Sequence, residues 1–140
     1  TQLWADRRLP YLAAVPARVR FVSCEPLLGP LDLCASLKTS LGWVIAGGES
    51  GGGARKSDPA WFRALRDQCV KARVPFHFKQ WGSWGPASDG ELARMSKKAA
   101  GRVLDGRTWD GVPDVSPSAK GGRLLDDVPR RPVRQADRLG

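Results

Sequence analysis

Polar side chains that could do chemistry stand at or near the ends of three β-type segments. Glu25 follows residues 19–24, Glu49 comes shortly after residues 43–46, and Lys79 with Gln80 lies near the end of residues 76–81. Carboxylates can exchange protons with a substrate, and a lysine can bind an anionic group as a point charge. These residue types predict either acid–base chemistry or the binding of a charged substrate.

The elements that position these side chains form a strand–helix–strand unit. Residues 19–24, 43–46 and 76–81 are rich in Val, Ile and aromatic residues, as β-strands are. Asp58 and Pro59 predict a helix start, because Asp caps free N–H groups and Pro loses no hydrogen bond at the first helical position. Apolar residues then recur at helical spacing as far as Arg73, ahead of Pro75. The order predicts a βαβ unit with parallel strands.

Parallel strands bring their carboxyl ends to one edge, where chemistry gathers in α/β sheets and barrels. The sequence therefore predicts Glu25, Glu49 and Lys79 as catalytic residues of a shared site. The residues predicted to bind substrate are Gly47, Gly48, Ser50, Gln80 and Trp81, the last as a stacking wall. One alternative is that Lys79 pairs with a glutamate without any ligand. Another is that the glycine loop is a tight turn with a solvated Glu49.

The remaining chain predicts less regular structure. An imperfect helix is expected from Leu3 to Val15, interrupted by a proline, and one or two helical turns between Leu33 and Leu41. A β-hairpin is expected over about residues 94–113, turning at an Asp-Gly pair. Residues 1–113 are thus predicted to form one domain, and residues 114–140 a disordered basic tail.

Charge suggests a different function. The formal net charge is +9 with a pI near 10.2, so polyanions are attracted. A basic patch on the predicted hairpin, together with aromatic residues, would suit nucleic acid. Its members are Lys97, Lys98, Arg102 and Arg107. The alternative is an ordinary solvated charged face.

Composition argues against several protein classes. No apolar stretch approaches the roughly 20 residues of a membrane span, and no leader segment is recognised, so a cytoplasmic protein without membrane contact is expected. The three cysteines, Cys24, Cys34 and Cys69, form no CxxC pair, so neither a metal site nor a disulfide framework is predicted. His77 alternates with phenylalanines, which favours a structural residue over a catalytic one.

Several sequence blocks resemble a known family. They are VRFVSCEPLLGPLDL, WVIAGGESGGGAR, FRALRDQC, FHFKQWGSW and KKAAGRVLDGRTWDGVP, within about Leu3 to Pro113. They resemble the carboxyl-terminal half of an uncharacterised phage-derived family whose full-length members look like radical S-adenosylmethionine proteins. That resemblance implies an amino-terminal half with a CxxxCxxC segment, whose thiolates would hold a four-iron cluster beside S-adenosylmethionine. This sequence lacks the segment, so no cofactor is expected in the chain itself.

The resemblance implies an α/β fold that is half of a TIM-like barrel. The residues alone are equally consistent with a second fold, a small parallel sheet with a βαβ unit. In either fold a β-hairpin and a disordered tail follow. Open sheet edges of a half barrel must be paired, by the missing amino-terminal half or by a second copy of the chain. The leading hypothesis is a carboxyl-terminal fragment that supplies carboxyl-edge residues to a shared site. The others are a basic nucleic-acid-binding module without catalysis and an inactive gene fragment.

Overall fold

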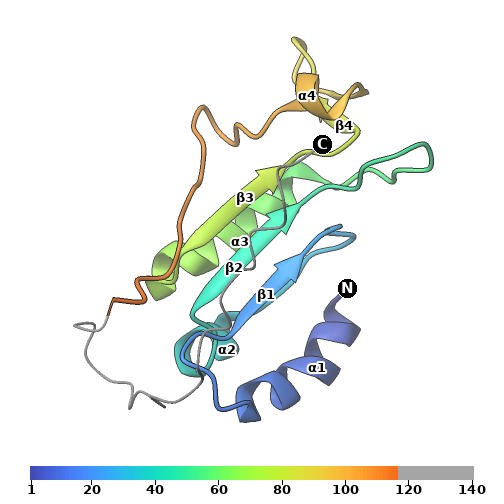
Figure 1. Cartoon of the computed structure of the whole chain (residues 1–140). Helices are drawn as coiled ribbons and strands as arrows, with labels where there is room; N and C mark the ends of the chain where they lie inside the picture. Colours follow the sequence, from blue (N-terminus) through green and yellow to red (C-terminus); the bar gives the residue numbers. More distant parts are fainter. Residues whose placement is uncertain (117–140) are drawn as a thin grey trace, which may run out of the picture.

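A computed structural model describes residues 1–116 and has the predicted α/β architecture (Figure 1). The first six elements are α1 (Gln2–Ala14), β1 (Phe21–Cys24), α2 (Cys34–Thr39), β2 (Trp43–Gly47), α3 (Pro59–Ala72) and β3 (Phe76–Gln80). A smaller unit follows, made of β4 (Trp84–Pro86), β5 (Leu92–Arg94) and α4 (Lys97–Ala100).

The three longer strands form a parallel sheet in the order β1-β2-β3. Val22 pairs with Val44, and Ala46 pairs with Phe78, so neighbouring strands are aligned near their carboxyl ends. Helix α3 connects β2 to β3. The predicted βαβ unit is therefore confirmed.

Helix α3 begins and ends as its sequence predicts. The Asp58 side chain accepts a hydrogen bond from the Ala60 amide at 2.8 Å, and Pro59 occupies the first turn. The helix buries Phe62, Leu65 and Cys69, and the Phe62 ring lies 5.0 Å from the Phe78 ring. Burying large side chains of this kind stabilises the fold by about 1.5–3 kcal/mol each.

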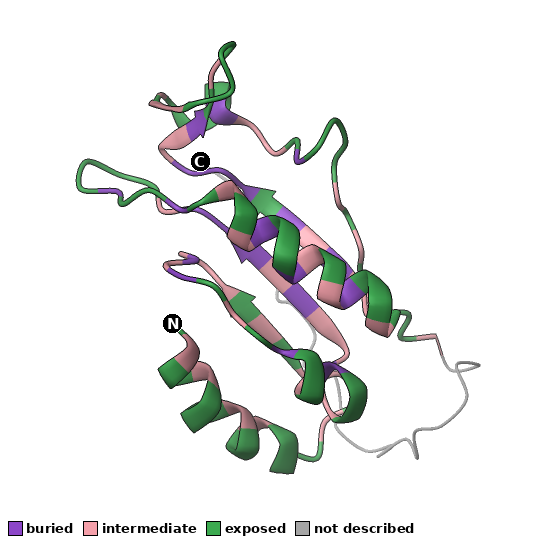
Figure 2. Ribbon diagram, turned by 180° about the vertical axis from the view of Figure 1, so that it is seen from behind, coloured by how far each residue is buried: buried purple, intermediate pink, exposed green. Residues whose placement is uncertain are grey.

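The two faces of the parallel sheet differ. Helices α1, α2 and α3 lie on one side of the sheet (Figure 2). The residues of this helical face are Val22, Cys24, Val44, Ala46, Phe76 and Phe78. The open face carries the alternate residues Phe21, Ser23, Trp43, Ile45, His77 and Lys79. All six open-face residues are exposed or half-buried, with Phe21 47% exposed. Among residues 1–116, no helix covers the open face.

The edges of the parallel sheet also differ. Segment 109–111 runs along β3, where the Phe78 amide donates to the Trp109 carbonyl and the Gly111 amide donates to the Phe76 carbonyl. The outer edge of β1 pairs with no strand in the described part of the chain. Helix α1 lies beside β1 without burying any of its own residues fully.

The hairpin predicted over residues 94–113 is limited to one turn. Asp105 and Gly106 adopt positive φ angles of 53° and 78°, as an Asp-Gly turn requires, but only one bridge, Leu104 to Arg107, accompanies them. The chain beyond the turn pairs with the edge of β3, because that edge offers unpaired backbone groups. The extended hairpin is instead β4–β5, and Lys97–Ala100 is helical.

The predicted tail lies almost wholly outside the described residues, which end at Ser116. In the described part, every helix is too short or too polar to cross a bilayer.

Candidate functional site

Three predicted site residues meet at the carboxyl edge of the sheet. Glu25 directly follows β1, and Lys79 and Gln80 end β3. The Lys79 ammonium donates to Glu25 Oε2 at 2.7 Å, and the Gln80 amide nitrogen donates to Glu25 Oε1 at 2.7 Å. We call these three side chains the Glu25 cluster. It confirms that residues far apart in the sequence converge at this edge.

Gly47 makes the Glu25 cluster possible. It ends β2, which lies between β1 and β3, and a Cβ atom there would stand 3.0 Å from Glu25 Oε1. A larger side chain would push the carboxylate away from β3. Gly47 therefore leaves the space that the Glu25 carboxylate occupies.

The Glu25 cluster is buried at Gln80 and exposed to solvent at Lys79. The Glu25 side chain is 17% exposed and the Lys79 side chain 52% exposed, while Gln80 is 7% exposed. Gln80 Oε1 is buried and accepts no hydrogen bond from the described residues. Ser50 Oγ lies 3.3 Å from the Gln80 amide nitrogen, so this predicted substrate-binding residue borders the cluster.

Glu49 does not join the Glu25 cluster. Its carboxylate accepts three hydrogen bonds from Arg55, from the backbone amide, Nε and Nη2, at 2.7–2.8 Å. The predicted grouping of Glu25, Glu49 and Lys79 is therefore corrected. Arg55, six residues along the chain, provides a nearer cation, and the pair closes the glycine loop upon itself.

We expect Glu49 to stay ionised in unusually acidic solution. The Arg55 side chain, helped by the Arg55 amide, lowers the pKa of Glu49 from 4.5 to about 2. Because the folded-state pKa lies below the unfolded value, the pair stabilises the loop above about pH 4.5, and this contribution is lost as the pH falls toward 2. An NMR titration of the Arg55 amide should show its main transition near pH 2. A transition near pH 4.5, or no change in Glu49→Gln at neutral pH, would contradict the interaction.

Gly48 and Trp81 pack against each other instead of facing a ligand. A Cβ atom on Gly48 would lie 1.9 Å from the Trp81 carbonyl oxygen. The Trp81 ring is 4% exposed, contacts Phe62 and Phe78, and donates its indole N–H to the Val103 carbonyl at 2.8 Å. Trp81, predicted as a stacking wall, is thus a core residue, because its ring fills the space beside Phe62 and Phe78.

The predicted basic patch divides in two. Lys97, Lys98 and Arg102 line a shallow open cavity of about 440 Å³ together with Lys79, Gln80 and Gly101. Arg107 lies elsewhere, with its guanidinium 3.6 Å from the centre of the Trp109 ring. The structure therefore places three of the four basic residues beside the Glu25 cluster.

His77 lies on the open face, and its buried Nδ1 has no hydrogen-bond partner among the described residues. Its ring meets Trp43 edge-on at 6.4 Å. Partial burial, together with nearby Arg102 and Lys79, lowers the pKa of His77, so the neutral imidazole is favoured.

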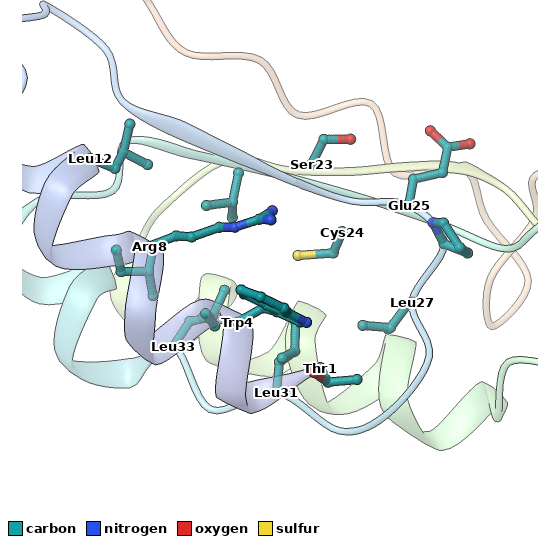
Figure 3. Close-up of a pocket in the computed structure, with 14 residues that line it drawn as sticks. Thr1, Trp4, Arg8, Leu12, Ser23, Cys24, Glu25, Leu27, Leu31 and Leu33 are labelled. Atoms are coloured by element: carbon teal, nitrogen blue, oxygen red, sulfur yellow. The ribbon is translucent and has the colours of Figure 1, made fainter.

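The cysteines differ in their environments. Cys24 points toward α1 and Trp4, on the side of β1 opposite Glu25 (Figure 3). Burial raises the pKa of Cys24 to about 11 and that of Cys69 to about 12, so both thiols stay protonated. Cys34 is exposed. Within residues 1–116, no three His, Cys, Asp or Glu side chains gather as a metal site would require.

Sequence reasoning missed two residues that shape the carboxyl edge. Arg55 forms an ion pair with Glu49. Its position directly after the glycine loop was the sequence feature that could have indicated this pair. Trp84 holds the same loop by donating its indole N–H to the Ala54 carbonyl at 2.7 Å. Nothing in the sequence distinguishes Trp84 from the other tryptophans.

Comparison with known proteins adds one match. The model of a family described as "Protein of unknown function (DUF5131)" matches residues 1–113. Neither the curated proteins nor the solved structures contain a match.

Proposed function

We propose that this chain, which belongs to the DUF5131 family, forms one wall of a substrate-binding site at the carboxyl edge of an α/β barrel. The remaining wall would come from further strands beside β1. In this proposal the chain supplies substrate-binding groups and acts together with a second polypeptide segment.

The Glu25 cluster carries the proposal. Glu25 reaches across Gly47 to Lys79 and Gln80, so side chains from two non-adjacent strands converge where α/β proteins bind ligands. Lys79, half exposed, would bind an anionic part of the substrate. Glu25 would hold Lys79 in place or accept a proton. Glu49 has no catalytic role in this proposal, because Arg55 occupies its carboxylate.

The open face supports completion by further strands. Its aromatic side chains are only half covered, with Phe21 and Trp43 ring centres 5.4 Å apart. In a barrel, this face would point inward and be covered by strands from the opposite side. The outer edge of β1, which pairs with no strand among residues 1–116, offers the backbone groups to which a neighbouring strand would bond.

The loose fit of α1 leaves further apolar surface accessible beside β1. A cavity of about 410 Å³ separates α1 from β1, lined largely by apolar residues (Figure 3). Trp4 is 50% exposed and Tyr11 79% exposed. Strands added beside β1 would bring their own helices against this surface.

The finer proposal is a radical S-adenosylmethionine-like protein. Residues 1–116 supply no cluster of cysteines, so they do not fit a four-iron cluster. The cluster and S-adenosylmethionine would have to be held by a different half.

Co-expression with an amino-terminal half that carries the CxxxCxxC segment tests the proposal. The chain would carry Ser23→Cys on the open face and Cys34→Ser, because Cys34 is itself exposed. We expect a stable complex in which maleimide labels Cys at position 23 much more slowly than in the chain alone. Lys71→Cys, on the outer side of α3, is the control and should react equally in both. Equal labelling of both sites in the complex, or no complex, would refute barrel completion.

A further inference from the structure

We infer that the cavity beside the Glu25 cluster binds a phosphate group. The cavity is lined by Lys79, Gln80, Lys97, Lys98, Gly101 and Arg102. Four of these six residues are cationic and no carboxylate is among them, while carbon atoms form most of the cavity surface. A phosphate bound in this cavity would belong to the substrate of the carboxyl edge. This placement of the substrate next to Glu25 rests on the proposed function, whereas phosphate binding itself does not.

Helix α4 places Lys97 and Lys98 at the cavity. Ser96 caps the helix by accepting a hydrogen bond from the Ala99 amide at 3.1 Å. Ala100 is buried against Gly85, where a Cβ atom would stand 2.7 Å from the Ala100 Cβ. The Trp81 amide then donates to the Gly101 carbonyl, which ties the end of α4 to the end of β3. Lys97 and Lys98 are thus held next to Lys79 by backbone contacts.

The charge of the residues around the cavity favours an anion. Lys79 is paired with Glu25, and Arg102 is paired with Asp110. Lys97 and Lys98 are exposed, and neither forms an ion pair within residues 1–116. Two uncompensated positive charges at a shared cavity favour a phosphate group, which near neutral pH carries one negative charge as a diester and nearly two as a monoester. The chain's net charge of +9 would also speed the approach of such a ligand.

Phosphate could come from a small phosphorylated molecule or from a nucleic-acid strand, and the experiment separates these sources. Calorimetric titrations at low ionic strength would use phenyl phosphate as the first probe and a short oligothymidylate as the second. We expect Lys97→Gln combined with Lys98→Gln to weaken binding by about tenfold or more, because each lysine can form a charge-assisted hydrogen bond. Loss of phenyl phosphate binding would indicate a small-molecule source. Loss confined to the oligonucleotide would indicate a strand.

A control variant that also loses two lysines separates binding in the cavity from general attraction between an anion and a positively charged protein. Lys38→Gln with Lys71→Gln removes two exposed lysines from α2 and α3, away from the cavity. This variant and Arg107→Gln should bind within about twofold of the unaltered chain, as expected for distant surface charges. Equal weakening by both double variants, or no binding of either probe, would overturn the inference. Because the titration measures binding alone, its failure would leave barrel completion to be judged by the labelling experiment.

Discussion

Trp81→Ala should destabilise the fold by about 3–5 kcal/mol, the usual cost of removing a buried tryptophan. Trp81 is 4% exposed, and its ring meets Phe62 at 5.4 Å and Phe78 at 5.0 Å. Truncation would leave a cavity and an unpaired Val103 carbonyl, which now accepts the indole N–H. Chemical denaturation followed by circular dichroism would measure the loss.

Two further tryptophan variants separate the contributions of packing and hydrogen bonding. Trp81→Phe keeps much of the ring but loses the indole N–H, so a smaller loss of about 1–3 kcal/mol is expected. Trp4→Ala serves as the control, because Trp4 is 50% exposed on α1 and its removal should cost about 1 kcal/mol, well below the loss at Trp81. If Trp81→Ala were as stable as Trp4→Ala, Trp81 would be free to serve as the ligand-stacking wall that its sequence position predicts.

Gly48→Ala should destabilise the fold by about 3 kcal/mol or more, since the added methyl group meets backbone and not a movable side chain. The new Cβ would stand 1.9 Å from the Trp81 carbonyl oxygen and 2.7 Å from its carbonyl carbon. The Gly48 amide also donates to the Gln80 carbonyl at 2.9 Å, so a shift there would separate β2 from β3. A fall in the unfolding midpoint in urea would report the effect.

Gly52→Ala is the matched control for Gly48→Ala. Gly52 belongs to the same loop, but a Cβ atom there meets nothing within 4 Å. Its stability should change by no more than about 0.5 kcal/mol, or rise, because alanine restricts the unfolded chain. Equal losses from both substitutions would show that the loop requires glycine for flexibility, and the close contact at Gly48 would not be the reason.

Trp81 and Gly48 both help to position the residues of the Glu25 cluster. Gln80 precedes Trp81, and Gly48 follows Gly47, so each structural residue adjoins one that positions or forms the cluster. The close packing of Gly48 on Trp81 fixes the end of β2 against the end of β3. Glu25 can then meet Lys79 and Gln80 without a separate positioning group.

The local sequence predicted much of the fold. Strand composition located β1, β2 and β3, and the Asp58 cap with Pro59 located the start of α3. These features depend on backbone preference and on the nearest neighbours, which a sequence displays directly. Parallel pairing then follows from the strand–helix–strand order, and it brings Glu25 and Lys79 to one edge.

The pairing of the polar groups and the burial of the aromatic rings depended on contacts between distant segments. Glu49 could have met Lys79, but Arg55 is closer once the loop folds back. Trp81 and the basic residues near α4 received their roles from packing between distant segments, which no local pattern encodes. The local sequence was therefore enough to predict the strands, the main helix and the edge at which Glu25 and Lys79 meet. The fold decided the partner of each charge, because a charge binds the nearest opposite group in space and not in sequence.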